Sequence, residues 1–170
     1  MSRLLPKLPM LLALLVLTAC VTLVAPYDAT FDQSLNKFSE DTAKFMAAAK
    51  AGGPERRFDS KETVAYYAGG YNLLDRLIQR AGMKRGKACL SNAAVQAIAN
   101  SPTTRTELPD DFLDADCIEV ELYSVRLNLD QMNYAHETGG VLTREEAIAT
   151  NTALELTILN AIRTFLENKG

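Results

Sequence analysis

Tryptophan is absent from the sequence, and histidine occurs only once, at position 136. A single imidazole excludes the di-iron helical bundles, because these bind their metal through two Glu-x-x-His motifs. Covalently attached haem is excluded as well, since the sequence has no Cys-x-x-Cys-His motif. We therefore expect no metal and no cofactor. His136 is expected to pack or to form hydrogen bonds near a helix end; the alternative is that it binds a metal or a non-covalent haem.

The signatures of common catalytic sites are also missing. There is no Gly-x-Ser-x-Gly motif for a nucleophilic serine and no glycine-rich nucleotide fingerprint. The carboxylates Glu119 and Glu121 are two positions apart, so on a helix they point to different sides. With His136 as the only candidate base, the sequence predicts no catalytic residue and a protein that is not an enzyme.

No charge of one sign dominates the chain. It has 18 Lys and Arg residues against 21 Asp and Glu residues, a net charge of −3 at pH 7. Because nucleic-acid binding needs a basic face that neutralises phosphates, we expect no nucleic-acid partner. The hydrophobic content of 48% and charged content of 23% are typical of a globular protein. A chain of 170 residues is long enough for one domain with a single core.

The apolar run from Met10 to Leu17 is too short to span a bilayer comfortably, since a spanning helix needs about 20 apolar residues. Two cations, Arg3 and Lys7, precede this run, and small residues follow it. Positive residues, a short apolar run and small residues, in this order, are typical of a secretory signal.

The signal segment ends in Leu17-Thr18-Ala19-Cys20, an aliphatic residue and two small residues before a cysteine. This tetrapeptide resembles the lipobox of bacterial lipoproteins. The resemblance implies that a diacylglycerol is attached to the Cys20 thiol, that the chain is cut before Cys20, and that the new amino group is acylated. The alternatives are an ordinary secretory signal with a chance cysteine, or a short N-terminal anchor.

The same resemblance implies an organisation and a location for the chain. Residues 1–19 would be the signal peptide, residues 20–27 a lipidated tether, and residues 28–170 the domain. Each buried acyl methylene contributes about 0.8 kcal/mol, so two or three chains hold a protein on a membrane in effect permanently. Val21 stands where Asp acts as a retention signal in some bacteria. Valine instead of aspartate at this position favours a location at the outer membrane of the bacterial cell envelope, with the domain facing the periplasm.

Apolar residues recur at alternating spacings of three and four in four segments, which is typical of amphipathic helices. These segments are residues 28–51, 60–81, 110–138 and 143–170. The buried stripes are expected to include Val64 in the second segment and Ile148, Leu159 and Leu166 in the last. The sequence therefore predicts an all-α fold, a four-helix and mostly antiparallel bundle. The long middle connection is expected to carry a short extra helix around residues 91–100.

Several residues are typical of helix starts. Asp59 with Glu62, and Thr143 with Glu146, have the spacing of capping boxes. An acidic cluster is expected in the first two turns of the third helix, where it would complement the helix dipole. It consists of Asp110, Asp111, Asp114 and Asp116.

The stretch from Ile118 to Leu129 also alternates between apolar and polar residues in two short parts, as a strand would. A strand would have to slip register at Tyr123 and Ser124, whereas the helical stripe continues through both parts. We therefore predict a helix here.

Two cysteines remain when Cys20 is assigned to lipidation, namely Cys89 and Cys117. An even pair in an oxidising compartment favours a disulfide. By closing a loop in the unfolded chain, it would stabilise the folded protein by about 3–4 kcal/mol on the chain-entropy model. Free thiols and a redox-active pair are the alternatives, although the pair lacks the Cys-x-x-Cys spacing of redox sites.

A disulfide between these cysteines would bring a basic and an acidic cluster together. The basic residues are Arg80, Lys84, Arg85 and Lys87. Mutual neutralisation with the aspartates near Cys117 is one interpretation, and each such surface pair is worth about 0–1 kcal/mol. The other interpretation is a patch that binds an anionic partner, such as lipid head groups or an acidic protein.

Three tyrosines lie close together in the second segment, beside Gly69 and Gly70. Tyr66, Tyr67 and Tyr71 could line a ligand pocket, or they could be core residues with a polar tip at the surface. With no catalytic signature, we expect a non-enzymatic binding or assembly module of the envelope with a protein partner. The alternative is a helical bundle that binds a small molecule or lipid.

Overall fold

The computed structural model describes residues 29–84, 86, 88–89 and 108–167. The predicted signal peptide, the lipobox, the tether and the short helix around residues 91–100 lie outside the described residues, as do Arg85 and Lys87. In the described part, no helix is long and apolar enough to cross a membrane.

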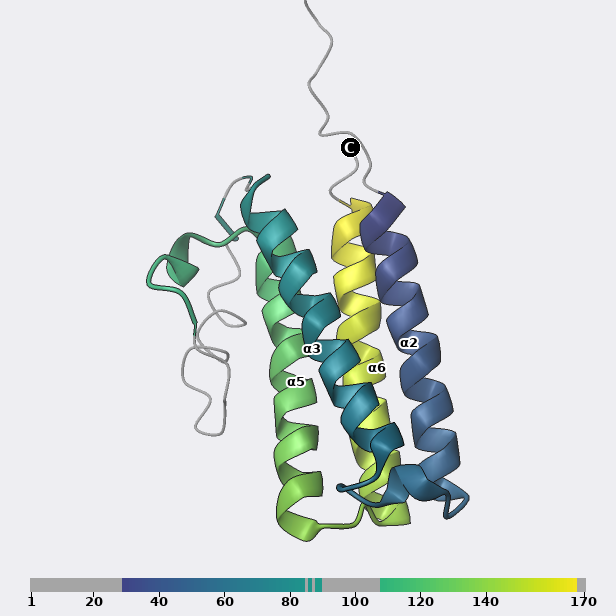
Figure 1. Cartoon of the computed structure of the whole chain (residues 1–170). Coiled ribbons are helices and arrows are strands. Elements are labelled where there is room, and N and C mark those ends of the chain that lie inside the picture. Colours follow the sequence, from purple (N-terminus) through teal and green to yellow (C-terminus); the bar gives the residue numbers. More distant parts are fainter. Residues whose placement is uncertain (1–28, 85, 87, 90–107, 168–170) are drawn as a thin grey trace, which may run out of the picture.

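Four long helices form an antiparallel bundle (Figure 1). They are α2 (Ala29–Lys50), α3 (Lys61–Gly82), α5 (Cys117–Gly139) and α6 (Arg144–Glu167). Two 3-10 turns lie in the connections, η2 (Pro54–Arg56) and η3 (Phe112–Asp114). α2 contacts α3 and α6, and α5 also contacts α3 and α6, so each helix lies beside two antiparallel neighbours. The predicted all-α bundle is confirmed, and so is the helical interpretation of residues 118–129.

Each helix buries one stripe of side chains in a shared core. Residues such as Leu35, Leu74, Leu129 and Ile158 are almost completely buried. α6 buries a narrow stripe that consists of Ala147, Leu154, Ile158, Ala161 and Phe165.

The predicted burial of four apolar residues is wrong. They are Val64, Ile148, Leu159 and Leu166, and all are exposed. Ile148 follows the buried Ala147, and Leu159 follows the buried Ile158. Adjacent helical residues point about 100° apart at 3.6 residues per turn, so a narrow contact cannot bury both members of such a pair.

The helix starts differ in part from the expectation. Thr143 and Glu146 do form the predicted capping box: the Glu146 amide donates to Thr143 Oγ1, and the Thr143 amide donates to Glu146 Oε2 at 2.9 Å. The predicted Asp59 cap of α3 is wrong, because Ser60 is the N-cap and its Oγ accepts from the Thr63 amide at 3.1 Å. Asp59 instead forms an ion pair with Arg57.

The third helix begins later than expected, so the acidic cluster is not in its first two turns. Asp116 is the N-cap of α5, with the Ile118 and Glu119 amides donating to its Oδ1. The Asp116 amide donates back to Glu119 Oε2, which completes a capping box. The other three aspartates precede the helix. Phe112, in the turn η3, packs against Val120 and so folds this segment back onto α5.

At the opposite end of the bundle, the connection between α2 and α3 is joined to the turn between α5 and α6. The Phe58 amide donates to the Gly140 carbonyl at 3.1 Å, and the Leu142 amide donates to the Arg56 carbonyl at 2.8 Å. Gly140 adopts φ 67°, the left-handed conformation in which glycine carries no steric cost. These bonds fix the ends of all four helices relative to one another.

Candidate functional site

Of the three clustered tyrosines, Tyr66 and Tyr67 have rings in contact, with centroids 5.3 Å apart, whereas Tyr71 lies against α5. Tyr66 stacks on Phe45 of α2, with ring centroids 4.0 Å apart, and its hydroxyl lies 3.0 Å from Thr42 Oγ1. Tyr67 is buried, and its hydroxyl lies 3.2 Å from His136 Nδ1. Tyr71 faces α5, where its hydroxyl accepts from Asn133 Nδ2 at 3.0 Å. The structure therefore does not bring the three rings together in one pocket.

Burial raises the pKa of all three tyrosine hydroxyls above the ordinary value. For Tyr66, the Thr42 hydroxyl partly opposes this effect. For Tyr71, the hydrogen bond from Asn133 and the guanidinium of Arg126, centred 5.0 Å from the ring, act in the same opposing direction. The hydroxyls stay protonated at neutral pH and can serve as hydrogen-bond donors.

Tyr66 alone of the three lines an open groove between α2 and α3, which we call the α2/α3 groove. Its volume is about 780 Å³. Phe38, Phe45, Tyr66, Gly70 and Leu73 form its apolar and aromatic floor. The α2 wall consists of Ser34, Lys37, Asp41, Lys44 and Ala48; the α3 wall consists of Glu62, Ala65, Gly69 and Arg76.

Three aromatic rings and Gly70 form most of the groove floor between α2 and α3. A Cβ at Gly70 would lie 2.9 Å from Leu129 Cδ2 and 3.0 Å from Phe38 Cε2, so glycine is required for the close packing of the floor. A Cβ at Gly69 would meet nothing within 4 Å. Gly69 therefore leaves the groove open without being needed for the core.

The charges on the groove walls are unevenly distributed along its length. Glu55 of η2 and Glu62 lie at the end where α2 stops and α3 starts, with Lys44 on the opposite wall. Arg76 lies toward the other end, where Lys37 forms an ion pair with Asp41 at 2.6 Å. Walls of mixed sign suit a ligand that carries both charges rather than a uniformly anionic one.

A second hollow continues the groove toward the end of α3. Its volume is about 280 Å³, and it shares Ser34, Leu73 and Arg76 with the first. Arg80 and Met83 line its far part. Together the two hollows follow α2 and α3 over most of their length, about 33 Å for a helix of 22 residues at 1.5 Å per residue.

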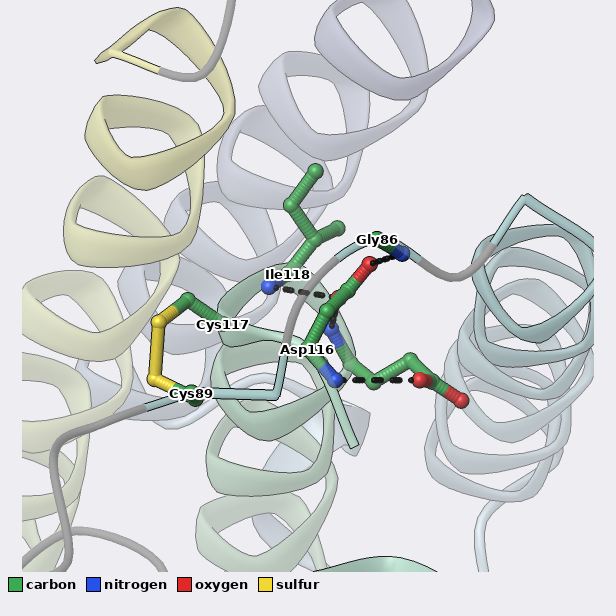
Figure 2. Close-up of a disulfide and its surroundings, with 6 residues drawn as sticks. Gly86, Cys89, Asp116, Cys117 and Ile118 are labelled. Atoms are coloured by element: carbon green, nitrogen blue, oxygen red, sulfur yellow. Dashed lines mark hydrogen bonds between the residues drawn. A yellow bond between two sulfur atoms is a disulfide. The ribbon is translucent and has the colours of Figure 1, made fainter. Parts of the chain in front are cut away.

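The predicted disulfide is present between Cys89 and Cys117, with Cα atoms 4.6 Å apart (Figure 2). Cys117 is the first residue of α5. The Cys89 amide donates to the Ala115 carbonyl at 2.9 Å, and the Gly86 amide donates to Asp116 Oδ2 at 3.0 Å. The cross-link and these bonds fix the segment after α3 to the start of α5.

The described residues after α3 therefore meet the start of α5 at this end of the bundle. Asp116, which also caps α5, accepts a hydrogen bond from the Gly86 amide. Of the four predicted patch residues, Arg80 and Lys84 lie in the described part, and both have interactions with other groups. The patch interpretation stays a prediction.

His136 is completely buried near the end of α5, opposite the disulfide at the start of this helix. Its Nε2 lies 2.9 Å from the Arg56 carbonyl oxygen and donates to it, so Nδ1 accepts from the Tyr67 hydroxyl in the neutral ring. Burial lowers the pKa of His136, against a smaller opposing effect of the Arg56 carbonyl. Among the residues that the structure describes, no group of three or more His, Cys, Asp or Glu side chains could hold a metal ion.

The α2/α3 groove is thus the candidate site, and it is larger than the hollow that continues it. Tyr66 could be identified from the sequence, whereas the residues of the groove walls were not predicted. Ser34, Lys37, Asp41, Lys44 and Ala48 repeat at spacings of three and four along α2. This repeat forms a second stripe on α2 beside the buried one. It is the sequence feature from which the groove wall could have been predicted. No protein-family model, no curated protein and no solved structure matches the chain.

Proposed function

We propose that this protein is a lipid-anchored, non-enzymatic binding or assembly module of the bacterial cell envelope, held on the periplasmic face of the outer membrane through acyl chains on Cys20. The lipobox-like residues Leu17 to Cys20 support the anchor. The observation that carries the binding role is the open α2/α3 groove, with an aromatic floor and charged walls. A protein partner in the envelope would bind there.

The proposed anchor puts the groove within reach of other envelope proteins. Nine residue steps separate Cys20 from Ala29, the first residue of α2. At no more than about 3.3–3.6 Å per residue, the tether reaches at most about 32 Å. α2 starts at the end of the bundle where α6 finishes (Figure 1), and the groove extends from that end along the length of the bundle.

The anchor is tested by the intact mass of the mature protein and by the variant Cys20→Ser. We expect the wild-type mass to equal residues 20–170 plus a diacylglycerol and an N-linked acyl chain, and Cys20→Ser to remain uncleaved and unacylated. A variant that matures and fractionates with membranes like the wild type would overturn the lipid anchor.

The binding role is tested by photo-crosslinking in living bacteria. A benzoylphenylalanine at Ala65, on the groove wall, is expected to form an adduct with a defined protein. The same group at Ala135, an exposed residue of α5 outside the groove, serves as the control. Adducts of equal yield from both positions, or none from Ala65, would contradict a binding groove.

A small amphiphile or lipid is the second candidate ligand. The volume of about 780 Å³ lies within the range of small-molecule sites. Phosphatidylethanolamine, whose head group carries both charges, would then raise the melting temperature of the wild type but not of Gly69→Leu, in which the groove is filled. An equal shift in both proteins, or no shift in either, would exclude this candidate.

A further inference from the structure

An exposed apolar stripe on α6 has no partner within the described part of the chain. Ile148 is 48% exposed, Leu156 56%, Leu159 57% and Leu166 42%. At 3.6 residues per turn these four side chains fall within about 80° of the helix circumference. Single exposed apolar residues are ordinary on protein surfaces, whereas aligned ones indicate an interaction surface.

We propose that α6 of one copy of this chain lies in the α2/α3 groove of a second copy. This inference rests on the proposed binding role of the groove and names its occupant. The stripe would cover the aromatic floor, and Gly69, Ala65 and Ala48 on the walls let a helix approach closely. The walls repeat at spacings of three and four, which is the periodicity that a packed helix requires.

The lengths of the two surfaces match. α6 has 24 residues, and the helices that border the groove have 22 each. The groove and its continuation extend from Glu55 to Met83 along these helices. A helix the length of α6 therefore fills the groove from end to end.

The charges favour one direction for the bound helix. With its N-terminus at the Glu55 and Glu62 end, α6 places Arg144 beside these two carboxylates and Glu145 beside Lys44. The positive end of its dipole then meets the acidic end of the groove, and the negative end meets Arg76. In the reverse direction Arg144 would meet Arg76, whereas in the proposed direction the cation near the end of α6, Arg163, is already paired with Glu167.

This direction also agrees with a shared membrane. α6 and α3 run in the same direction within one copy (Figure 1), so a second α6 parallel to α3 belongs to a copy of the same orientation. All copies then have the start of α2, and the proposed anchor, at the same end. Confinement of the copies to one membrane raises their effective concentration.

The contact is heterologous, because two different surfaces of the chain meet. Each copy keeps a free groove on one side and a free α6 stripe on the other, so the contact propagates. The expected product is a ring or row of copies on the membrane rather than an isolated dimer.

The test places benzoylphenylalanine at Leu159 of the full chain and irradiates the bacteria. We expect adducts at the mass of two copies and higher multiples, with the cross-linked peptide mapping to the α2 or α3 wall. Gly69→Leu fills the groove and should lower the yield by about tenfold, as for loss of a central contact. Ala68→Leu adds the same side chain at an exposed position outside the groove and should leave the yield unchanged.

Several results would overturn the inference. They are the absence of a two-copy adduct, a link from position 159 to α6 of the other copy, or equal yields from Gly69→Leu and the wild type. Circular dichroism melting of the purified variants verifies that each is folded. If Ala65 in the groove forms an adduct only with a different protein, the inference fails while the proposed binding role stands.

Discussion

At the scale of single residues, two adjacent glycines in α3 have opposite environments. Gly70 faces the core, where an added Cβ would lie 2.9 Å from Leu129 and 3.0 Å from Phe38. Gly69 faces the open groove, where an added Cβ would meet nothing within 4 Å. An alanine substitution at each position therefore tests one effect. At Gly69 it tests the helix-forming tendency of alanine, and at Gly70 it tests the effect of the added methyl group on packing.

We predict that Gly70→Ala lowers the free energy of unfolding by about 1–3 kcal/mol, the usual cost of overpacking a core. Gly69→Ala is expected to raise it by about 0.5–1 kcal/mol, because alanine is the better helix former. Urea unfolding of the mature protein measures both. Equal effects of the two substitutions would contradict the packing of Gly70 against Phe38 and Leu129.

The single histidine makes stability depend on pH. His136 is buried in its neutral form, and burial lowers its pKa in the folded protein. The unfolded chain therefore takes up the proton first as the pH falls. His136 contributes its full stabilisation above about pH 6.5, the unfolded value, and this stabilisation is lost as the pH falls from there toward the folded pKa.

We predict that the urea midpoint of the wild type falls between pH 7.5 and pH 5.5, and that the fall is smaller in His136→Gln. Glutamine keeps a polar side chain beside Tyr67 and the Arg56 carbonyl but does not titrate. The carboxylates titrate in both proteins, among them Glu121, whose pKa is raised by burial. The difference between the two proteins in the fall of the urea midpoint is therefore due to His136. Identical slopes would show that His136 is not buried as a neutral ring.

At the scale of secondary-structure elements, the start of α5 depends on one side chain. Asp116 accepts from the Ile118 and Glu119 amides, and its other oxygen accepts from the Gly86 amide. We predict that Asp116→Ala lowers the free energy of unfolding by about 1–2 kcal/mol, as for loss of an N-cap. Thermal melting under oxidising conditions measures this loss.

Asp116→Asn is the matched control, because asparagine is an equally good N-cap but turns an NH2 group toward the Gly86 amide in place of the accepting oxygen. It should retain the capping part of the stability that Asp116→Ala loses, but not the bond to Gly86. If both variants are as stable as the wild type, the first turn of α5 does not depend on this side chain.

The four helices could be predicted from the sequence because each carries a buried stripe with helical spacing. Sequence spacing did not reveal how wide each stripe is, since that depends on which neighbours cover the helix. Ile148 and Leu159 of α6 were therefore assigned to the core, although only one member of each adjacent pair is buried. The start of α5 was placed too early, because Phe112 packs back onto the helix through contacts that are not local in sequence.

The candidate site was predicted less well than the helices. Tyr66 was identified together with Tyr67 and Tyr71, but the three hydroxyls have different partners, and only Tyr66 lines the groove. A groove between two helices depends on how far apart they pack, and here Phe38 and Phe45 of α2 and Gly70 of α3 set that distance. The spacing of residues within one helix does not show which residues of two neighbouring helices face each other.

At the scale of the whole molecule, the two ends of the bundle are held in different ways. Backbone hydrogen bonds join the connections at the end that contains His136 and Gly140. At the other end, the disulfide between Cys89 and Cys117 joins the chain after α3 to the first residue of α5. The two cysteines are 28 positions apart in the sequence and close one loop, so the cross-link restricts the unfolded chain considerably.

We predict that reduction of this disulfide lowers the free energy of unfolding by about 3–4 kcal/mol, from the loop length on the chain-entropy model. For a domain of this size the melting temperature should fall by about 10 °C. The double variant Cys89→Ala, Cys117→Ala should melt like the reduced wild type and be insensitive to dithiothreitol. Since α2 and α6 contact each other through residues remote from the cross-link, the variant should keep its helical circular dichroism at 25 °C. A wild-type melting temperature that dithiothreitol leaves unchanged would contradict a stabilising role for the bridge.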